Sequence, residues 1–238
     1  MTVHSKARPV FIAAMQREIA ALVKGWRVEA QSSSKHISVY SNEDAVVACA
    51  GMGVRRATLA VEAALALGPA SELVSVGWAG ACNVGLQVGD VIRPGVVIDA
   101  KTGERFFVAE PGTTEAATVL VTIARPAGAV EKQRLGMSYH ASAVDMEAAA
   151  VGRIARAREV PFSAIKSISD EADFELPDMQ QFSTSDGQFR ELAFGFHLAF
   201  RPRLWPPVMT MAKSSKLAAE RLYTEIEAYI QDCRERRS

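Results

Sequence analysis

Acidic side chains stand at three places where an apolar strand pattern gives way to a loop or a helix. Glu18 follows the first apolar run, Asp170 follows the run "FSAIKSIS", and Glu147 stands where a helix opens in "DMEAAAVGR". Carboxyl groups can protonate a leaving group, take a proton from water or stabilise a developing positive charge. In open α/β sheets, ligands collect at the carboxyl ends of the strands. A surface role explains each acid singly, whereas a shared acidic site explains all three together, and the pattern leaves both interpretations open.

Two turns carry small residues next to predicted strands. The turn "CAGMGVRR" has two glycines before a helix, but Arg56 stands at the third glycine position of the dinucleotide-binding fingerprint, so this motif is not met. That turn is either a plain strand-to-helix connection or an anion-binding turn that uses backbone N–H groups. In "GWAGACNVGLQVGDVI", Gly77, Ala79 and Gly80 are small enough for a ligand to approach the backbone.

Other common catalytic motifs do not occur in the sequence. It has no Gly-x-Ser-x-Gly elbow and no P-loop, which argues against serine hydrolases and NTPases. The four histidines show no metal-ligand spacing. The cysteines, which we expect to be reduced thiols because they are odd in number and far apart, are Cys49, Cys82 and Cys233.

The composition favours one soluble α/β domain that binds a small molecule. The chain has 238 residues, of which 49% are hydrophobic, so we expect a single domain over residues 1–238 with a substantial core. Lys plus Arg and Asp plus Glu both number 27, and this balance argues against nucleic acid as the partner. The sequence shows neither a signal-peptide pattern nor an apolar run of membrane-spanning length, so we expect no membrane span and a cytoplasmic location.

Short apolar runs alternate with longer segments of helical period, which predicts a layered α/β fold. Two of the runs, 45–51 and 72–80, show little polar interleaving, as central strands covered on both faces do. The other predicted strands are 9–15, 36–41, 91–100, 117–124 and 162–167, and the predicted helices are 54–68, one from about 146 that ends before Pro161, and 216–231.

The least regular part of the sequence runs from Asp170 to Pro207. It contains four prolines around the aromatic segment "FRELAFGFHLAFRPRLW". We expect an excursion from the core rather than a separate domain. Residues 189–205 form either a buried amphipathic helix or an apolar wall over part of a ligand pocket.

Three segments together carry a resemblance to a known family. In chain order, "FIAAMQREIAAL", "GWAGACNVGLQVGDVI" and "AVDMEAAAVGRIARAREVPFSAIKSISDEAD" resemble the nucleoside phosphorylase and nucleosidase superfamily, and more closely its methylthioadenosine/S-adenosylhomocysteine nucleosidase branch. The segments "GERF" and "FRPRLWPPVM" are also similar to hopanoid-associated phosphorylase-like proteins.

The resemblance implies a three-layer α/β/α sandwich around a central mixed, partly barrel-like sheet. It also implies cleavage of a ribosyl N-glycosidic bond without a metal or an organic cofactor. Proteins of this kind are commonly homodimers in which the neighbour contributes to the 5′ end of the pocket. We therefore expect a homo-oligomer with a nucleoside as substrate.

The resemblance assigns roles to individual residues. Asp170 would hydrogen-bond or protonate N7 of a departing purine, with Ser169 helping to hold its loop. Glu147 would bind the ribose hydroxyls, and Met146 would pack against the sugar. Glu18 matches the nucleosidase glutamate that positions and deprotonates the attacking water. The small residues Ala79 and Gly80 and the neighbouring Trp78 complete the predicted substrate contacts.

Departures from the family pattern favour water over phosphate as the nucleophile. Trp78 stands where phosphorylases commonly have a small hydroxyl residue that binds phosphate, and Glu18 stands where they tend to have an arginine. Asp145 replaces the first glutamate of the nucleosidase pattern, and its shorter side chain weakens the case for a sugar contact there.

The sequence thus predicts a purine nucleosidase, an N-glycosyl hydrolase that releases adenine from a 5′-modified adenosine. One alternative is a purine nucleoside phosphorylase, a pentosyltransferase similar to the hopanoid-associated proteins. In that case phosphate would be recruited by one of the cations Arg17, Arg55, Arg56 or Lys101. Another alternative is a nucleoside-binding protein that has lost turnover.

Overall fold

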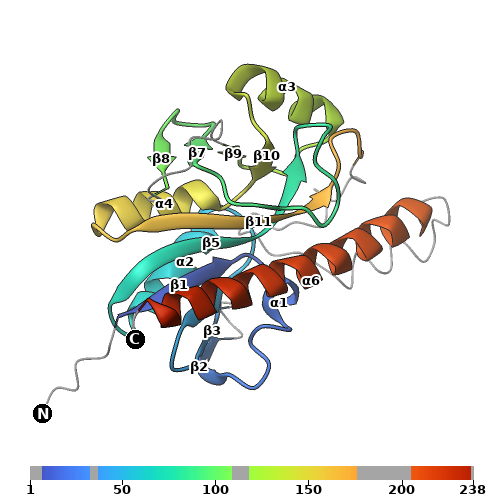
Figure 1. Cartoon of the computed structure of the whole chain (residues 1–238). Helices are drawn as coiled ribbons and strands as arrows, with labels where there is room; N and C mark the ends of the chain where they lie inside the picture. Colours follow the sequence, from blue (N-terminus) through green and yellow to red (C-terminus); the bar gives the residue numbers. More distant parts are fainter. Residues whose placement is uncertain (1–6, 33–36, 109–117, 176–204, 237–238) are drawn as a thin grey trace, which may run out of the picture.

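A computed structural model describes residues 7–32, 37–108, 118–175 and 205–236 of the chain. They form a mixed sheet with helices on both faces, as Figure 1 shows. In that view β5 and β11 lie between α4 on one side and the long helix α6 on the other. The expected α/β/α layering is confirmed.

The bounds of the elements follow the predicted alternation closely. The strands are β1 (Arg8–Ala13), β2 (Arg27–Ser32), β3 (Ile37–Ser41), β4 (Val46–Cys49), β5 (Ala70–Ala81), β6 (Val91–Ile92), β7 (Val96–Asp99), β8 (Arg105–Phe107), β9 (Val119–Thr122), β10 (Ala143–Asp145) and β11 (Phe162–Asp170). The helices are α1 (Gln16–Ile19), α2 (Val54–Leu65), α3 (Ala129–Tyr139), α4 (Ala148–Ala157) and α6 (Trp205–Glu235).

The sheet is mixed and does not close on itself. Its strand order is β2-β3-β4-β1-β5-β10-β9-β7-β8, and β11 pairs with β5 and with β6. Strand β5 is the centre of this arrangement, because it pairs in parallel with β1 along its first half and with β11 along most of its length. At its end, around Gly80, it pairs with the antiparallel β10 in place of β1. The carboxyl ends of β1, β5 and β11 therefore come together.

Each face of the sheet buries its own apolar cluster. Strand β1 shows the alternation, since Val10 and Ile12 belong to the cluster beneath α2 and α4, while Phe11 belongs to the cluster beneath α6. Helix α6 buries one stripe at helical spacing, formed by Ala218, Leu222, Ile226 and Tyr229. Both faces being covered explains why the central strands lack polar interleaving.

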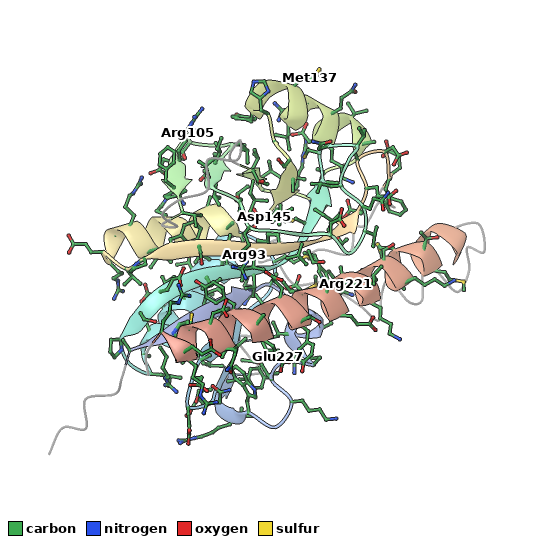
Figure 2. The ribbon with its side chains drawn as sticks, viewed as in Figure 1. Arg93, Arg105, Met137, Asp145, Arg221 and Glu227 are labelled. Carbon is green, nitrogen blue, oxygen red and sulfur yellow. The ribbon has the colours of Figure 1, made fainter. Side chains whose placement is uncertain are left out.

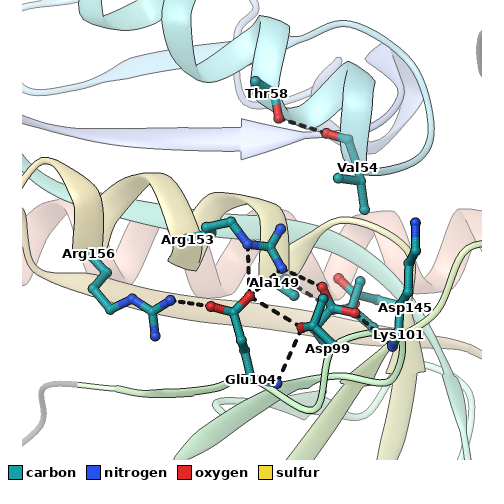
Figure 3. A network of polar contacts seen from close by, with 11 residues as sticks. Val54, Thr58, Asp99, Lys101, Glu104, Asp145, Ala149, Arg153 and Arg156 are labelled. Atoms are coloured by element: carbon teal, nitrogen blue, oxygen red, sulfur yellow. Dashed lines mark hydrogen bonds and ion pairs between the residues drawn. The ribbon is translucent and has the colours of Figure 1, made fainter.

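A network of ion pairs fixes α4 to the turn between β7 and β8. Arg153 Nη2 lies 2.5 Å from Asp99 Oδ2, and Arg153 also donates to Glu104 Oε2 at 2.8 Å (Figure 3). Arg156 pairs with the second oxygen of Glu104. Hydrogen bonds from these two arginines lower the pKa of Glu104 to about 2. Helix α4 therefore packs on the sheet through its apolar face and is fixed by these ion pairs at its polar face.

The structure differs from the sequence-based prediction at several elements. Helix α3 and the short strands β2, β8 and β10 were not predicted. Helix α6 begins at Trp205, eleven residues before the predicted start at 216, so the irregular segment does not extend to Pro207 as expected. Pro206 and Pro207 fit the first turn of α6, where N–H groups have no intrahelical partner. Most of the aromatic segment 189–205 lies outside the described residues.

No helix within the described ranges combines the length and the apolar composition that a membrane span requires. All three cysteines are free thiols, as expected.

The close packing of α4 on the sheet predicts a steric effect at Gly152. A Cβ atom there would lie 2.9 Å from Phe106 Cγ and 3.1 Å from Phe162 Cε1. We expect Gly152→Ala to lower the free energy of unfolding by about 1–3 kcal/mol, although alanine is the better helix former. Urea denaturation measures this, with the exposed Ala157→Ser on the same helix as a control. A Gly152→Ala protein as stable as wild type would show that the two rings yield freely.

Candidate active site

A cavity of about 550 Å³ opens at the carboxyl ends of β1, β5 and β11. Part of its wall comes from α6, through Met211, Ala212 and Ser215. Every site residue predicted from the sequence lines it, namely Glu18, Trp78, Ala79, Gly80, Asp145, Met146, Glu147, Ser169 and Asp170. The three acids that the sequence placed after separate elements therefore face one space.

Glu18 is held at the start of α1, directly after β1. Its side chain is buried, and Oε2 accepts hydrogen bonds from the N–H groups of Ala14 and Met15, both at 3.0 Å. Gly77 of β5 makes room for it, since a Cβ atom there would lie 3.1 Å from Glu18 Oε2 and the φ of Gly77 is 131°. Burial raises the pKa of Glu18, against the lowering effect of these N–H groups and of Lys166. A raised pKa makes this carboxylate a stronger base toward water.

Glu147 stands immediately before α4 and is also buried. Its Oε1 accepts a hydrogen bond of 2.6 Å from the backbone N–H of Gly53, the residue before α2. Gly53 has a φ of 89°, which favours glycine. The "CAGMGVRR" turn is thus an anion-binding turn whose anion is a carboxylate of the protein itself.

Asp145 serves mainly as an internal anchor. Its Oδ1 accepts from the Thr122 hydroxyl at 2.6 Å, and its Oδ2 accepts from the N–H of Ala148 at 2.8 Å. The same Oδ2 lies 3.0 Å from Lys166 Nζ. In Figure 2, Asp145 lies in the interior, whereas Arg105 and Met137 lie at the periphery. With both oxygens engaged, Asp145 orients the start of α4 and thereby Glu147.

Lys166 is the buried cation beneath this acidic cluster. Its side chain is 1% exposed, and Nζ also donates to the carbonyl of Val76 at 3.3 Å. Burial by itself lowers the pKa of Lys166, but Asp145, Glu147 and Glu18 outweigh it, so the pKa lies above its ordinary value. One ammonium group thus faces three carboxylates, and the cluster carries surplus negative charge when all are ionised.

The pKa of Glu147 reflects both its burial and the surplus negative charge of this cluster. Burial, followed by the charge of Asp145, raises the pKa of Glu147 to about 7, although Lys166 and the Gly53 N–H act in the opposite direction. The carboxyl group of Glu147 is therefore only partly ionised near neutral pH.

Asp170 lies at the other end of the cavity, at the last residue of β11. Its Oδ1 accepts the Ser169 hydroxyl at 2.6 Å, and its Oδ2 forms an ion pair with Lys132 of α3. Gly80 of β5 packs against this pair. Gly77 and Gly80 are three residues apart on β5, so the places where Glu18 and Asp170 meet that strand are separated by about 10 Å along it.

The cations that could bind phosphate are distributed unevenly. Of the four candidates from the sequence, Arg17 lines the cavity, whereas Arg55, Arg56 and Lys101 do not. The guanidinium of Arg17 stacks 5.0 Å from the centre of the Trp78 ring. Trp78 Nε1 is buried and has no hydrogen-bond partner among the described residues. The position of the expected phosphate-binding hydroxyl is thus filled by an indole.

Sequence reasoning missed Lys132, Lys166 and Thr122. Lys166 had a signal, because a lysine in the middle of the apolar strand "FSAIKSIS" has to be buried with a partner. Lys132 carried no such signal, because the charged and polar segment "EKQR" is typical of an exposed surface. Within the described ranges, no group of three or more histidine, cysteine or acidic side chains is arranged to hold a metal ion.

Comparison with known proteins identifies related sequences and folds. The family model of the phosphorylase superfamily matches residues 8–128 and 119–196. A search of curated proteins gave no match.

Solved structures share the fold at low sequence identity. A 5′-methylthioadenosine/S-adenosylhomocysteine nucleosidase from Helicobacter pylori has a TM-score of 0.69 and 14% identity, over 95% of this chain and 98% of that chain. The corresponding enzyme from Neisseria meningitidis, in complex with methylthio-immucillin-A, has a TM-score of 0.65 and 20% identity, over 92% and 96% of the two chains. Futalosine hydrolase of Helicobacter pylori has a TM-score of 0.64 and 18% identity, over 94% and 99%.

The raised pKa of Glu147 predicts a pH-dependent stability. Because the folded state holds this proton more tightly than the unfolded chain, with a pKa of about 7 against 4.5, stability falls as pH rises through that window. Replacing Glu147 by Gln should remove a contribution on the order of 3 kcal/mol from this decline. Urea unfolding at pH 5 to 8 measures it, with the exposed Glu43→Gln as control. Equal slopes for wild type and Glu147→Gln would contradict the assignment.

Proposed function

Because the chain belongs to the phosphorylase superfamily, we propose that it is a purine nucleosidase, an N-glycosyl hydrolase that releases adenine from a 5′-modified adenosine. One observation carries the proposal. Two carboxyl groups line a single cavity, and both pack against glycines of β5: the buried Glu18 against Gly77, and Asp170 of β11 against Gly80.

The negative charge of the cavity fits the transition state of glycosidic cleavage. As the bond between C1′ and the base breaks, the sugar becomes oxocarbenium-like and carries positive charge. Glu18, Glu147 and Asp145, with Lys166 paired to Asp145, provide an anionic environment that is fixed before the reaction begins.

Each end of the nucleoside then has a partner. The base lies against Asp170, which faces the N7 edge of the purine and delivers a proton to it. The ribose lies over Met146, with its hydroxyls on Glu147. Water is bound by Glu18, which takes its proton as the oxygen attacks C1′. Ala79 and Gly80 allow the nucleoside to approach the backbone of β5.

Water is favoured over phosphate because a carboxylate, Glu18, lines the cavity where a phosphorylase tends to have an arginine. Of the phosphate-binding cations predicted from the sequence, Arg17 lines the cavity, but its guanidinium stacks on Trp78. The solved nucleosidases of the same fold support hydrolysis as the reaction type.

The 5′ substituent is proposed to lie along α6. Apolar side chains of Met15, Met52, Met146 and Met211 line the cavity, and methionine adapts its shape to apolar ligands. This wall supports an apolar 5′ group, from the methylthio group of methylthioadenosine up to a hydrocarbon such as that of adenosylhopane. The predicted contribution of residues 189–204 lies outside the described residues. We also propose that the protein is a homodimer and that it is located in the cytoplasm.

The alternative of a silent binding protein is disfavoured because Glu18, Glu147 and Asp170 are all present and line one cavity. Turnover that is abolished by Asp170→Asn would exclude this alternative.

Replacing Asp170 by Asn tests the leaving-group role. The amide still hydrogen-bonds the base but cannot pass a proton to it, so we expect kcat to fall about 10²–10⁴-fold with adenine binding retained. Adenine release and calorimetric adenine binding measure the two effects. A variant within a few-fold of wild type would remove Asp170 from the mechanism.

Replacing Glu18 by Gln tests the nucleophile. Because an amide cannot accept the proton of water, we expect hydrolysis to stop. Turnover of the wild type should be unchanged by added phosphate, with ribose rather than ribose 1-phosphate as the sugar product. Stimulation by phosphate together with ribose 1-phosphate would show that the enzyme is a phosphorylase.

The length of the 5′ group tests the α6 wall. Each buried methylene contributes about 0.8 kcal/mol, so kcat/KM should rise from adenosine to methylthioadenosine to a long-chain 5′-alkyl adenosine. Met211→Ser should reduce the preference for the longest chain and leave adenosine unaffected. A kcat/KM that declines with chain length would point to the small methylthioadenosine class instead.

A further inference from the structure

Lys132 is a buried lysine that the reaction scheme above leaves unused. It belongs to α3, its side chain is 0% exposed, and Nζ donates to the carbonyl of Glu171 at 2.6 Å while it pairs with Asp170 Oδ2. A fully buried ammonium group is costly unless it is paired. Its partner, at 12% side-chain exposure, is the carboxylate that faces the cavity.

The backbone is built around this ion pair. A Cβ atom at Gly80 would lie 2.8 Å from Asp170 Oδ2 and 2.9 Å from Lys132 Cε, so a larger residue at this position of β5 would require the two side chains to shift. The Ser169 hydroxyl occupies Oδ1. Both oxygens of Asp170 are thereby fixed in direction before any ligand enters.

The pair also raises a chemical question. A carboxylate in an ion pair has no proton of its own to give to a leaving purine. The Lys132 ammonium carries a proton next to Asp170 Oδ2, and Lys132 belongs to the lining of the same cavity although its side chain is 0% exposed.

We propose that Lys132 is a positioning residue that supplies the leaving-group proton through Asp170. This rests on the proposed nucleosidase function. As the bond between C1′ and N9 breaks, its electron pair moves onto the purine. A proton passes from Lys132 Nζ to Asp170 Oδ2 and from that oxygen to N7, so adenine leaves neutral. Lys132, left as an amine, regains a proton from solvent before the next turnover, while Glu18 releases the proton it took from water.

The test compares Lys132→Met, Lys132→Arg, Asp170→Asn and the double variant Lys132→Met/Asp170→Asn. Arg134→Gln, exposed on the same helix, is the matched control. Adenine release from adenosine and methylthioadenosine gives kcat and KM, and calorimetry gives adenine affinity. We expect Lys132→Met to lower kcat about 10²–10⁴-fold, with adenine affinity retained.

Two results distinguish proton supply from a structural role. Loss of Lys132 should add nothing to Asp170→Asn, because both act in one step. Lys132→Arg should keep adenine affinity without restoring kcat, because a guanidinium keeps its charge but does not release its proton. Losses that multiply in the double variant, or an arginine variant with wild-type kcat, would overturn the proposal.

If Lys132→Met does not fold, Lys132→Gln replaces it, because its amide can donate to the carbonyl of Glu171 but has no ionisable proton. A Lys132→Gln protein with wild-type kcat would overturn the proposal. Wild-type protein that releases no adenine would refute the nucleosidase function itself, and this result needs no variant.

Discussion

The ion pair between Lys166 and Asp145 holds the arrangement on which the site depends. Lys166 projects from the middle of β11 and Asp145 ends β10, so the pair joins the two strands at the interior of the sheet. The same Oδ2 of Asp145 that pairs with Lys166 also accepts the N–H of Ala148 and so orients the start of α4. Removing one partner of such a pair leaves an uncompensated buried charge, typically at a cost of about 3–5 kcal/mol.

The same cation also limits the charge of the cavity. One ammonium group cannot neutralise Asp145, Glu147 and Glu18 together. Burial, followed by the charge of Asp145, raises the pKa of Glu147, and burial raises the pKa of Glu18. The imbalance destabilises the empty protein near neutral pH, whereas a positively charged sugar would relieve it. The unbalanced negative charge that destabilises the free protein would thus bind the transition state more strongly than the uncharged ground state. At the opposite end of the cavity, the buried Lys132 pairs with Asp170, the residue proposed to contact the base.

The alternating pattern made most of the fold predictable from the sequence. The buried strands β1, β4, β5 and β11 are short apolar runs, and the helices α2 and α4 repeat their apolar residues at helical spacing. By contrast, β10 is only three residues long, and α3 has no pronounced apolar face, so neither carried a clear signal. The length of α6 was underestimated because its prolines were taken as helix breakers rather than first-turn residues.

The gathering of acids around one cavity was also predictable, because Glu18 and Asp170 follow parallel strands whose carboxyl ends meet. The partners of those acids were not. Lys132 reaches Asp170 from a helix that lies 38 positions earlier in the chain, and the fit depends on the missing side chain of Gly80. Likewise the N–H of Gly53 meets Glu147 only because α2 and α4 lie side by side. Contacts of this kind arise from tertiary packing, which local sequence patterns do not encode.

The most direct measurement is a crystal structure of the protein with an adenine nucleoside analogue whose glycosidic bond cannot be cleaved. We expect N7 of the base within hydrogen-bond distance of Asp170, the ribose hydroxyls on Glu147, and an ordered water between Glu18 and C1′. An analogue bound with its base away from Asp170, or an anion held by Arg17 in place of the water, would contradict this expectation.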